Sequence, residues 1–331
     1  NYPVSLISWK VAPALAAGCT VIVKPSRETP LSTIAFVKAC NEAGLPSGVL
    51  NVVSGDNTMI SDEVFSNPLV RLVALTGSTD TGKEFVRASA KTLKRLVLEL
   101  GGHSPFIVFA DADLTKAVKD GVKRAFRNAG QICNSVNRIF VEEAIQDEYL
   151  RAFVEETQKL TLGGAFDTPV PDVGPMVNEA GLRRMEEFVQ DALQKGGKIM
   201  CGGKRPADPR LQKGFFFEPT VITNVSPDMK IMVEEPFGPI VAIDTFKSVD
   251  EAIAKANSTR YGLVSYLYTS DIRKAFLVAE RLESGSVAIN NISPDSLYAP
   301  YPGWKESGVG VELGMHGLEE YLEWKHIKLG I

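Results

Sequence analysis

The sequence has few residues that could bind metals or form disulfides. Its 331 residues include only four cysteines and three histidines. The cysteines are Cys19, Cys40, Cys133 and Cys201. Such wide spacing fits neither a disulfide framework nor a zinc site, so we predict no metal centre and expect a reducing, cytoplasmic compartment.

Long apolar runs and blocks of like charge are missing as well. The longest apolar stretch, residues 11–23, contains Pro13, Gly18 and Thr20 and is shorter than the roughly 20 residues that a membrane-spanning helix needs. The net charge is −4 and no basic block occurs, so we expect neither a membrane nor a nucleic acid as a partner. A hydrophobic fraction of 44% and a length suited to about two domains are typical of a globular protein.

Strands and helices are expected to alternate along the chain. The expected strands are residues 20–23, 49–53, 72–75, 96–98, 105–108, 139–142, 221–222, 263–268 and 286–289. The expected helices are residues 5–17, 31–42, 79–90, 113–127, 146–160, 179–195 and 272–282. This order predicts a parallel, doubly wound α/β sheet in the N-terminal part and a second α/β domain from Ser104 onward.

The dinucleotide-binding pattern G-x-G-x-x-G is absent. Gly77 and Ser78 nevertheless stand between an expected strand and an expected helix, where backbone N–H groups could bind a pyrophosphate. The alternative interpretation is a simple turn.

One cysteine stands in unusual surroundings. Cys133 follows Gly130 and lies among Asn128, Gln131 and Asn134, which are poor core residues but good hydrogen-bonding groups. A thiol attacks a carbonyl carbon as the thiolate, and a polar site can favour that form. We therefore predict that Cys133 is a nucleophile, whereas the other three cysteines are expected to be small buried side chains.

A carboxylate ends the last expected strand of the first domain. Glu99 is followed by Leu100 and by two glycines that free the backbone. A glutamate whose pKa is raised by an apolar pocket can take a proton from water. We interpret Glu99 as a general base, the alternative being a solvated surface side chain.

Together these motifs resemble the aldehyde dehydrogenase superfamily, from Asn1 to about Trp324. The resemblance depends on seven blocks in the same order. They are Asn1-Tyr2-Pro3, Lys24-Pro25-Ser26, Thr76-Gly77-Ser78, Glu99-Leu100-Gly101-Gly102, Gly130-Gln131-Ile132-Cys133, Glu234-Glu235-Pro236-Phe237-Gly238-Pro239 and Ser307-Gly308. The block Phe126–Gln131 looks most like the succinate-semialdehyde dehydrogenases.

The resemblance implies a division of the chain. Residues 1–102 correspond to the C-terminal part of an NAD(P)-binding domain, whose N-terminal part would precede Asn1 and is missing here. Residues 103–310 correspond to the catalytic, thiol-bearing domain. Residues 311–331 correspond to a tail whose edge strand pairs across the interface of a homodimer or homotetramer.

The resemblance also implies oxidation of an aldehyde to a carboxylic acid through a cysteine thioester. Cys133 attacks the aldehyde, Asn1 and the backbone N–H of Cys133 stabilise the oxyanion, and Glu99 activates the hydrolytic water. Lys10 and Glu312 are further candidate residues, and Glu312 matches a family glutamate near the water path. None of the three histidines falls in a matched block.

A nicotinamide cofactor is implied by the same blocks. Lys24 is expected to reach the adenosine ribose, Glu235 to hold the nicotinamide ribose and Phe237 to lie against the nicotinamide ring. The other expected cofactor residues are Ser26, Gly55, Gly77, Ser78 and Leu100.

One departure from the family pattern predicts which cofactor is used. Members that prefer NAD usually carry glutamate at the position of Arg27, where it accepts hydrogen bonds from the ribose. Arg27 cannot accept a hydrogen bond but can pair with a phosphate, so we predict NADP in preference to NAD. The alternative is a solvated arginine that contacts nothing.

Arg127 indicates the substrate, since in succinate-semialdehyde dehydrogenases the matching arginine binds the distal carboxylate. Ser296, in the long loop of residues 290–305, is a second candidate contact. A second arginine that those enzymes can use falls at Trp9, so lactaldehyde, glycolaldehyde or sulfolactaldehyde stay alternative substrates to succinate semialdehyde. A non-catalytic relative that keeps the fold is the remaining alternative.

Overall fold

The computed structural model describes residues 1–331, which divide into two compact units. Unit 1 comprises Asn1–Leu100, Asp295–Gly303 and Gly308–Ile331, and unit 2 comprises Gly101–Pro294 and Trp304–Ser307. The first break lies two residues before the expected one. Residues 295–303 and 308–310 group with unit 1 rather than with the thiol-bearing part, because short strands in this segment pair within unit 1.

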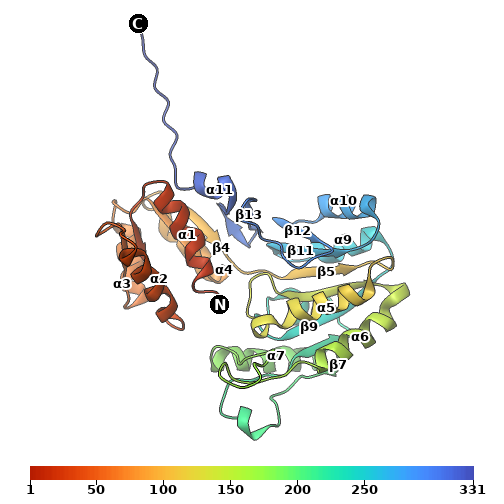
Figure 1. Ribbon diagram of the computed structural model, residues 1–331. Helices are drawn as coiled ribbons and strands as arrows, with labels where there is room; N and C mark the ends of the chain where they lie inside the picture. The colour runs from red at the N-terminus through yellow and green to blue at the C-terminus, as the bar shows by residue number, and fades with distance from the viewer. The chain divides into compact units, whose positions relative to one another are not determined.

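Unit 1 contains small sheets and the helices that connect their strands (Figure 1). Its elements are α1 (Ser5–Ala16), β1 (Val21–Val23), α2 (Pro30–Glu42), β2 (Leu50–Val52), α3 (Asn57–Ser66), β3 (Leu72–Thr76), α4 (Thr79–Ser89), β4 (Arg95–Glu99), β13 (Tyr301–Pro302), β15 (Gly308–Val309), β16 (Val311–Glu312) and α11 (Gly314–Glu319). The strands and helices predicted from the sequence within residues 1–100 are confirmed to within two residues at each end.

The predicted strands of unit 1 pair in parallel. β1 pairs in parallel with β2, and β3 pairs in parallel with β4, but the two pairs are not hydrogen-bonded to each other. β15 adds to β4 in the antiparallel direction, and β13 pairs with β16. The parallel α/β arrangement predicted for this part of the chain is therefore confirmed.

A small apolar cluster holds the first two helices and the first two strands of unit 1 together. Val11 of α1, Val23 of β1, Val37 of α2 and Leu50 of β2 are buried against one another. Apolar residues that recur along both helices thus cover the first strand pair. Helix α3 was not predicted, because only Phe65 of its side chains is buried and its main signal is the N-cap. The carboxylate of Asp56 supplies that cap by accepting from the N–H groups of Thr58 and Met59.

Unit 2 contains a seven-stranded sheet in the order β12-β11-β5-β6-β9-β8-β7. All neighbours are parallel except the edge strand β7, which is antiparallel to β8. The strands of this sheet are β5 (Ser104–Val108), β6 (Val136–Glu142), β7 (Lys198–Cys201), β8 (Thr220–Thr223), β9 (Ile240–Phe246), β11 (Val264–Tyr268) and β12 (Ser286–Ile289). Outside it, β10 (Tyr261–Gly262) pairs with β14 (Trp304–Lys305). The helices are α5 (Leu114–Phe126), α6 (Gln146–Gln158), α7 (Glu179–Gln194), α8 (Lys230–Val233), α9 (Val249–Asn257), α10 (Ile272–Arg281) and the 3-10 turns η1 (Arg127–Gly130), η2 (Glu143–Ile145) and η3 (Pro209–Leu211).

Helices cover both faces of this sheet. The connection from β5 to β6 and the connection from β9 to β11 cross the sheet in opposite directions. Because such crossovers are right-handed, α5 and α9 must lie on opposite faces, as Figure 1 shows. Every residue of β5 and β11 is buried, as expected for central strands of a doubly covered sheet.

Strand β9 and helix α9 were not predicted. The strand begins directly after Pro239, and its sequence Ile-Val-Ala-Ile-Asp-Thr-Phe alternates only in its second half. Helix α9 begins at a clear cap, since the Ser248 hydroxyl accepts from the N–H of Glu251. Strand β9 lies between β6 and β8, so the loop that precedes β9 lies next to the loop that precedes β6.

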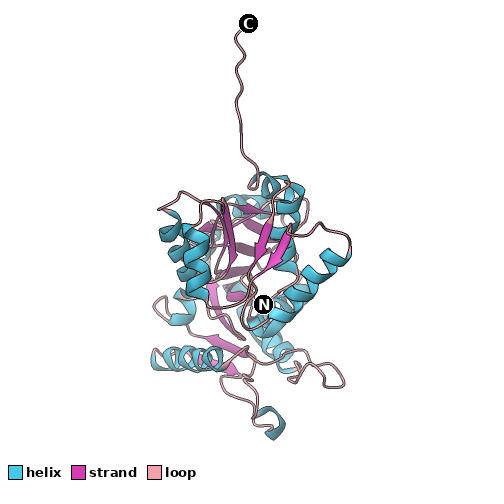
Figure 2. Ribbon diagram, turned by 90° about the vertical axis from the view of Figure 1, so that its left-hand side faces the viewer, coloured by secondary structure: helices cyan, strands magenta, loops and turns pink.

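The C-terminal segment forms no strand within the single chain. Residues 323–331 follow α11 without helix or strand, and Figure 2 draws them as a loop up to the C-terminus. The edge strand predicted for residues 321–331 is therefore absent from the isolated chain, and its pairing with a second copy stays a prediction. No helix in the structure has the length and apolar character needed to cross a membrane.

Candidate active site

Three loops of unit 2 meet at the amino ends of neighbouring strands. Gly102 lies just before β5, Cys133 just before β6, and the loop containing Glu235 and Phe237 just before β9. Because β5, β6 and β9 are adjacent and parallel, these loops enter the same edge of the sheet. Ligands of open α/β sheets usually bind at the carboxyl ends of the strands. The thiol lies at the opposite edge, at the amino ends.

Gly102 contacts both of the other loops. Its N–H donates to Oε1 of Glu235 at 3.1 Å. A Cβ atom at this position would lie 2.0 Å from the carbonyl oxygen of Cys133, so only glycine fits between the two. The structure thereby brings two predicted site residues, Cys133 and Glu235, into contact with one glycine.

The loop that carries the thiol has an unusual backbone. Asn128, Ala129 and Gly130 have φ angles of 53°, 54° and 68°. A run of left-handed residues costs roughly 1 kcal/mol or more for each non-glycine member, so contacts elsewhere must stabilise it. One such contact is at Gly130, where a Cβ would lie 2.1 Å from the carbonyl oxygen of Gly238.

The side chain of Gln131 stabilises the same loop. Its Oε1 accepts from the N–H of Val177 at 2.8 Å, and its Nε2 donates to the carbonyl oxygens of Asn128 and Pro175 at 3.0 and 3.3 Å. The buried amide therefore uses both of its ends to bind backbone groups. This explains structurally why a polar residue stands two positions before Cys133.

Arg184 of α7 holds the third loop. Its guanidinium donates to the carbonyl oxygens of Glu235 at 2.6 Å and Pro236 at 3.3 Å. Phe237, the next residue, has a φ angle of 51°. The arginine was not singled out from the sequence, because nothing in the sequence of α7 indicates what its exposed face contacts.

A buried arginine lies behind Gly102. Arg138 is fully buried and donates to the carbonyl oxygens of His103, Lys255 and Ala256. Burial lowers the pKa of Arg138 to about 9. Burial, and then the charge of Arg138, lowers the pKa of His103, whose Nε2 is 3.0 Å from the carbonyl oxygen of Ile231. His103 is therefore a neutral, structural side chain.

The carboxylate predicted to be the base lies in unit 1. Glu99 is the last residue of β4, is only 3% exposed, and is paired in register with Thr76 of β3 and Gly308 of β15. Lys10 donates to Thr76 Oγ1 at 2.6 Å and to Glu312 Oε1 at 2.5 Å. Lys10, Glu312 and the strand ends that include Glu99 thus form one buried polar region of unit 1.

The side chains predicted to bind the adenosine part of a cofactor follow β1. Lys24, Ser26 and Arg27 are all exposed. Partial burial, and then the charge of Arg27, lowers the pKa of Lys24, whose Nζ donates to the carbonyl oxygen of Pro25. Arg27 lies 3.8 Å from the carboxylate of Asp56, an exposed pair that contributes little to stability.

A second set of predicted cofactor residues follows β2, β3 and β4. Ser78 is the N-cap of α4, where its hydroxyl accepts from the N–H of Thr81, and the N–H of Gly77 donates to the carbonyl oxygen of Glu99. A Cβ atom at Gly82 of α4 would lie 2.5 Å from the side chain of Leu100. Glycine at this position therefore lets α4 approach Leu100, which follows β4, closely. Gly55 is exposed, with a φ angle of 159°.

The remaining predicted residues are exposed and keep local contacts. Asn1 Oδ1 accepts from the N–H of Tyr2 at 3.0 Å. Arg127 follows the end of α5, and Ser296 Oγ accepts from the N–H of Tyr298 at 3.3 Å. Their predicted roles toward an oxyanion and a substrate carboxylate stay predictions.

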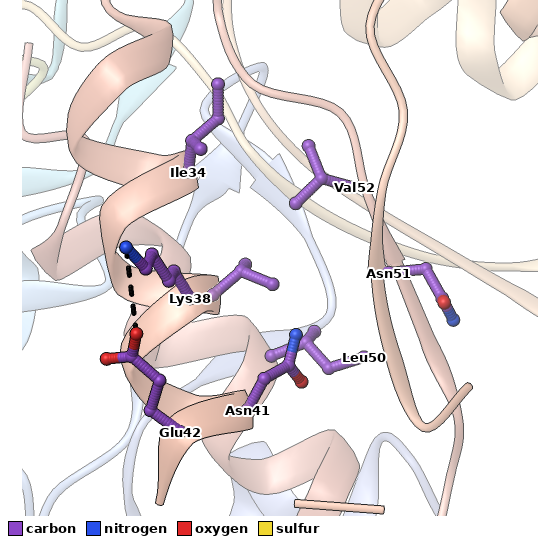
Figure 3. A pocket seen from close by; sticks show the side chains of 8 residues that line it. Ile34, Lys38, Asn41, Glu42, Leu50, Asn51 and Val52 are labelled. Atoms are coloured by element: carbon purple, nitrogen blue, oxygen red, sulfur yellow. Dashed lines mark ion pairs between the residues drawn. The ribbon is translucent and has the colours of Figure 1, made fainter. Parts of the chain in front are cut away.

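A cavity of about 550 Å³ lies elsewhere in unit 1, between α2 and β2 (Figure 3). Its lining residues are Ile34, Val37, Lys38, Asn41, Glu42, Leu50, Asn51 and Val52. None of the predicted site residues is among them, and its ion pair of Lys38 with Glu42 is exposed. The cavity therefore has no part in the candidate site.

Comparison with known proteins identifies the family. The sequence profile described as "Aldehyde dehydrogenase family" matches residues 1–327. The chain belongs to the aldehyde dehydrogenase family. It is 45% identical over 327 residues to betaine aldehyde dehydrogenase of Bacillus subtilis, covering 99% of this chain and 66% of that protein. It is 41% identical over 331 residues to the succinate-semialdehyde dehydrogenase [NADP(+)] of Escherichia coli, covering 100% and 68%.

Solved structures of the family show the same fold. Betaine aldehyde dehydrogenase from Staphylococcus aureus in complex with NAD+ matches with a TM-score of 0.95 and 41% identity, over 99% of this chain and 65% of that one. An NADP-dependent enzyme of E. coli matches with a TM-score of 0.96 and 41% identity, over 100% and 68%. The chain thus spans about two thirds of the length of these aldehyde dehydrogenases.

The contact at Gly102 leads to a test of the thiol loop. In Gly102→Ala, the new Cβ must displace the carbonyl of Cys133, so the variant should lose about 1–3 kcal/mol of stability, as overpacked cores do. The rate at which iodoacetamide alkylates Cys133 should fall, as measured by mass spectrometry of the peptide that contains it. The matched control is Gly174→Ala, because nothing lies within 4 Å of a Cβ there. Equal alkylation rates in both variants would contradict the proposed contact.

Proposed function

We propose that the protein oxidises an aldehyde to a carboxylic acid through a thioester on Cys133, with a nicotinamide dinucleotide as the oxidant. The observation that carries the proposal is the placement of Cys133, Gly102 and Glu235 at one edge of the unit 2 sheet. Membership of the aldehyde dehydrogenase family supports the same chemistry. An intact thiol and Glu99 argue against a non-catalytic relative.

The first half of the reaction is carried by Cys133. Its thiolate attacks the aldehyde carbon, and the carbonyl oxygen takes up the negative charge. The side-chain amide of Asn1 and the backbone N–H of Cys133 are the donors proposed to stabilise this charge. When bound, the cofactor accepts a hydride from the former aldehyde carbon, which leaves an acyl group on the sulfur.

The residues of unit 1 fit the phosphates and ribose of such a cofactor. Lys24 and Arg27 are exposed cations after β1, and Ser78 caps the N-terminus of the 11-residue helix α4, where N–H groups attract anions. In unit 2, Glu235 presents a carboxylate, the type of acceptor that suits ribose hydroxyls, beside Gly102. Lys24, Arg27 and Ser78 thus offer donors for phosphate, and Glu235 offers an acceptor for ribose.

The second half of the reaction is assigned to Glu99. Its carboxylate takes a proton from water as that water attacks the thioester, and the acid leaves while the thiol is restored. Three peptide units, which span at most about 11 Å, separate Glu99 from Gly102 along the chain. Gly102 in turn contacts the carbonyl of Cys133.

Replacement of the carboxylate tests this assignment. Glu99→Gln in the natural full-length protein should still form the acyl-enzyme and release one equivalent of reduced cofactor in a burst at 340 nm. Steady-state turnover should fall about 100-fold or more, the typical contribution of a general base. Cys133→Ser should abolish the burst, and the exposed Glu42→Gln should change neither phase. Full turnover by Glu99→Gln would contradict the role.

We further propose that NADP is preferred to NAD. Arg27 can donate two parallel hydrogen bonds to a ribose phosphate, and its side chain is exposed just after the end of β1. The E. coli relative is named as an NADP(+) enzyme, which is in keeping with this preference.

A change of charge at Arg27 tests the preference. Arg27→Glu should lower kcat/KM for NADP relative to that for NAD by about 10–100-fold, because a hydrogen bond to a charged group contributes about 1.5–3 kcal/mol. The exposed Arg71→Glu serves as a control for the change in net charge. An unchanged ratio in Arg27→Glu would show that this arginine does not select the cofactor.

Succinate semialdehyde or another short acidic aldehyde is the substrate we propose. Arg127 is an exposed cation six residues before Cys133, at the start of the thiol loop, and it would attract a distal anion and repel a cation such as betaine aldehyde. Ser296 is the second proposed contact. Sulfolactaldehyde is the alternative, since a relative of this name from Pseudomonas putida is 43% identical and is covered to 67% of its length.

Arg127→Ala tests the substrate class. With succinate semialdehyde, kcat/KM should fall about 10–100-fold, because one charged hydrogen bond is lost. With an uncharged aldehyde of similar length, it should change little. Lys123→Ala removes an exposed cation one turn earlier and is the matched control. If Arg127→Ala weakened both substrates equally, the arginine would have no role in recognising the carboxylate.

A further inference from the structure

A buried arginine binds the residue that follows the nucleophile. Arg124, in the last turn of α5, is 6% exposed. Its Nε donates to the carbonyl oxygen of Asn134 at 3.2 Å, and its Nη2 donates to the side-chain oxygen of the same asparagine. One guanidinium therefore binds both the backbone and the side chain of the residue next to Cys133.

A buried tyrosine completes this arrangement. The hydroxyl of Tyr266, on β11, donates to the carbonyl oxygen of Asn134 at 2.8 Å and accepts from Arg124 Nε at 2.7 Å. The guanidinium also lies 5.7 Å from the centre of the tyrosine ring. The carbonyl of Asn134 thus receives two donors, one from helix α5 and one from strand β11.

The loop also binds back to the helix. The hydroxyl of Ser135, which is fully buried, lies 3.2 Å from the carbonyl oxygens of Arg124 and Ala125 and donates to them. Helix α5 therefore donates to the loop through the side chain of Arg124 and accepts from it through its last-turn carbonyls. This exchange holds residues 134 and 135 against the helix end.

We propose that Arg124 and Tyr266 are positioning residues that orient the thiol of Cys133 through Asn134. The inference rests on the proposed function in so far as Cys133 is the nucleophile. Neither side chain needs to touch the substrate or the cofactor. They act by restricting the backbone immediately after the reacting residue, whose own carbonyl lies against Gly102.

The loop needs such a restraint. Its three left-handed residues precede Cys133, and regular β6 pairing begins only at Val136. Residues 131–135 therefore lack the hydrogen-bond ladder of a strand or the i→i−4 bonds of an α-helix. Since a displacement of about 1 Å from the productive geometry can cost about 100-fold in rate, the restraint at Asn134 bears directly on the attack.

A neighbouring tyrosine offers a matched control. Tyr268 stands two residues further on the same strand and is as deeply buried as Tyr266. Its hydroxyl donates at 2.7 Å to the carboxylate of Asp120, which also belongs to α5 but lies two turns before the thiol loop. Tyr266→Phe and Tyr268→Phe therefore each remove one buried hydroxyl between β11 and α5, and only the first removes a bond to Asn134.

The experiment compares the rate of Cys133 alkylation by iodoacetamide, read from its peptide by mass spectrometry, in the natural full-length protein and three variants. Tyr266→Phe should alkylate about 5–20-fold more slowly, and Arg124→Lys, which keeps the charge but loses the planar fork, at least as slowly. Tyr268→Phe should stay within about twofold of the unsubstituted protein, with a similar fall in Tm. The KM for the cofactor should not change in Tyr266→Phe.

Two results would overturn the proposal. One is an equal slowing in both tyrosine variants, which would mean a general loss of stability. The other is an unchanged rate in Tyr266→Phe, and this variant decides the matter even if Arg124→Lys does not fold. Because alkylation needs no aldehyde, the outcome is separate from that of the proposed function. Slower alkylation of Tyr266→Phe in a protein that oxidises no aldehyde would support positioning and reject the oxidation.

Discussion

The candidate site depends on a backbone contact that only glycine allows. Gly102 lies against the carbonyl of Cys133 while its N–H binds Glu235, and Gly130 lies in the same way against the carbonyl of Gly238. These close approaches join the three loops that enter β5, β6 and β9. Side chains then stabilise what the glycines permit, since Gln131 and Arg184 bind backbone groups of the same loops. The thiol thus belongs to a set of loops that are bound to one another at one edge of a sheet whose central strands are buried.

The two proposed chemical groups belong to two structural units. Glu99 ends a strand of unit 1, and Cys133 precedes a strand of unit 2. A short, glycine-containing segment, Leu100–Gly102, connects the carboxyl end of one parallel strand to the amino end of another. In open α/β sheets the carboxyl ends are the usual place for ligands, which suits the cofactor residues of unit 1. The thiol departs from that rule, because its loops gather at amino ends.

Predictability varied with the kind of signal that each element carries. Strands rich in β-branched residues, such as β1, were predicted from their residue types, and amphipathic helices such as α5 from the regular period of their apolar residues. Helix α3 was missed because a polar cap, not apolar periodicity, marks its start. The pairing of β15 with β4 could not be predicted either, since sequence does not show which distant segment pairs with the edge of a strand.

The order of motifs along the chain was enough to identify the aldehyde dehydrogenase family. The neighbours Gly130 and Gln131 led to the prediction, which stays a prediction, that Cys133 is the nucleophile. The roles of Arg124, Tyr266 and Arg138 came only from the folded structure. Each of them acts on backbone groups that are distant in sequence, Tyr266 on Asn134 and Arg138 on Ala256, for example. A backbone carbonyl is the same in every residue, so no sequence pattern can show which side chain will bind it until the chain has folded.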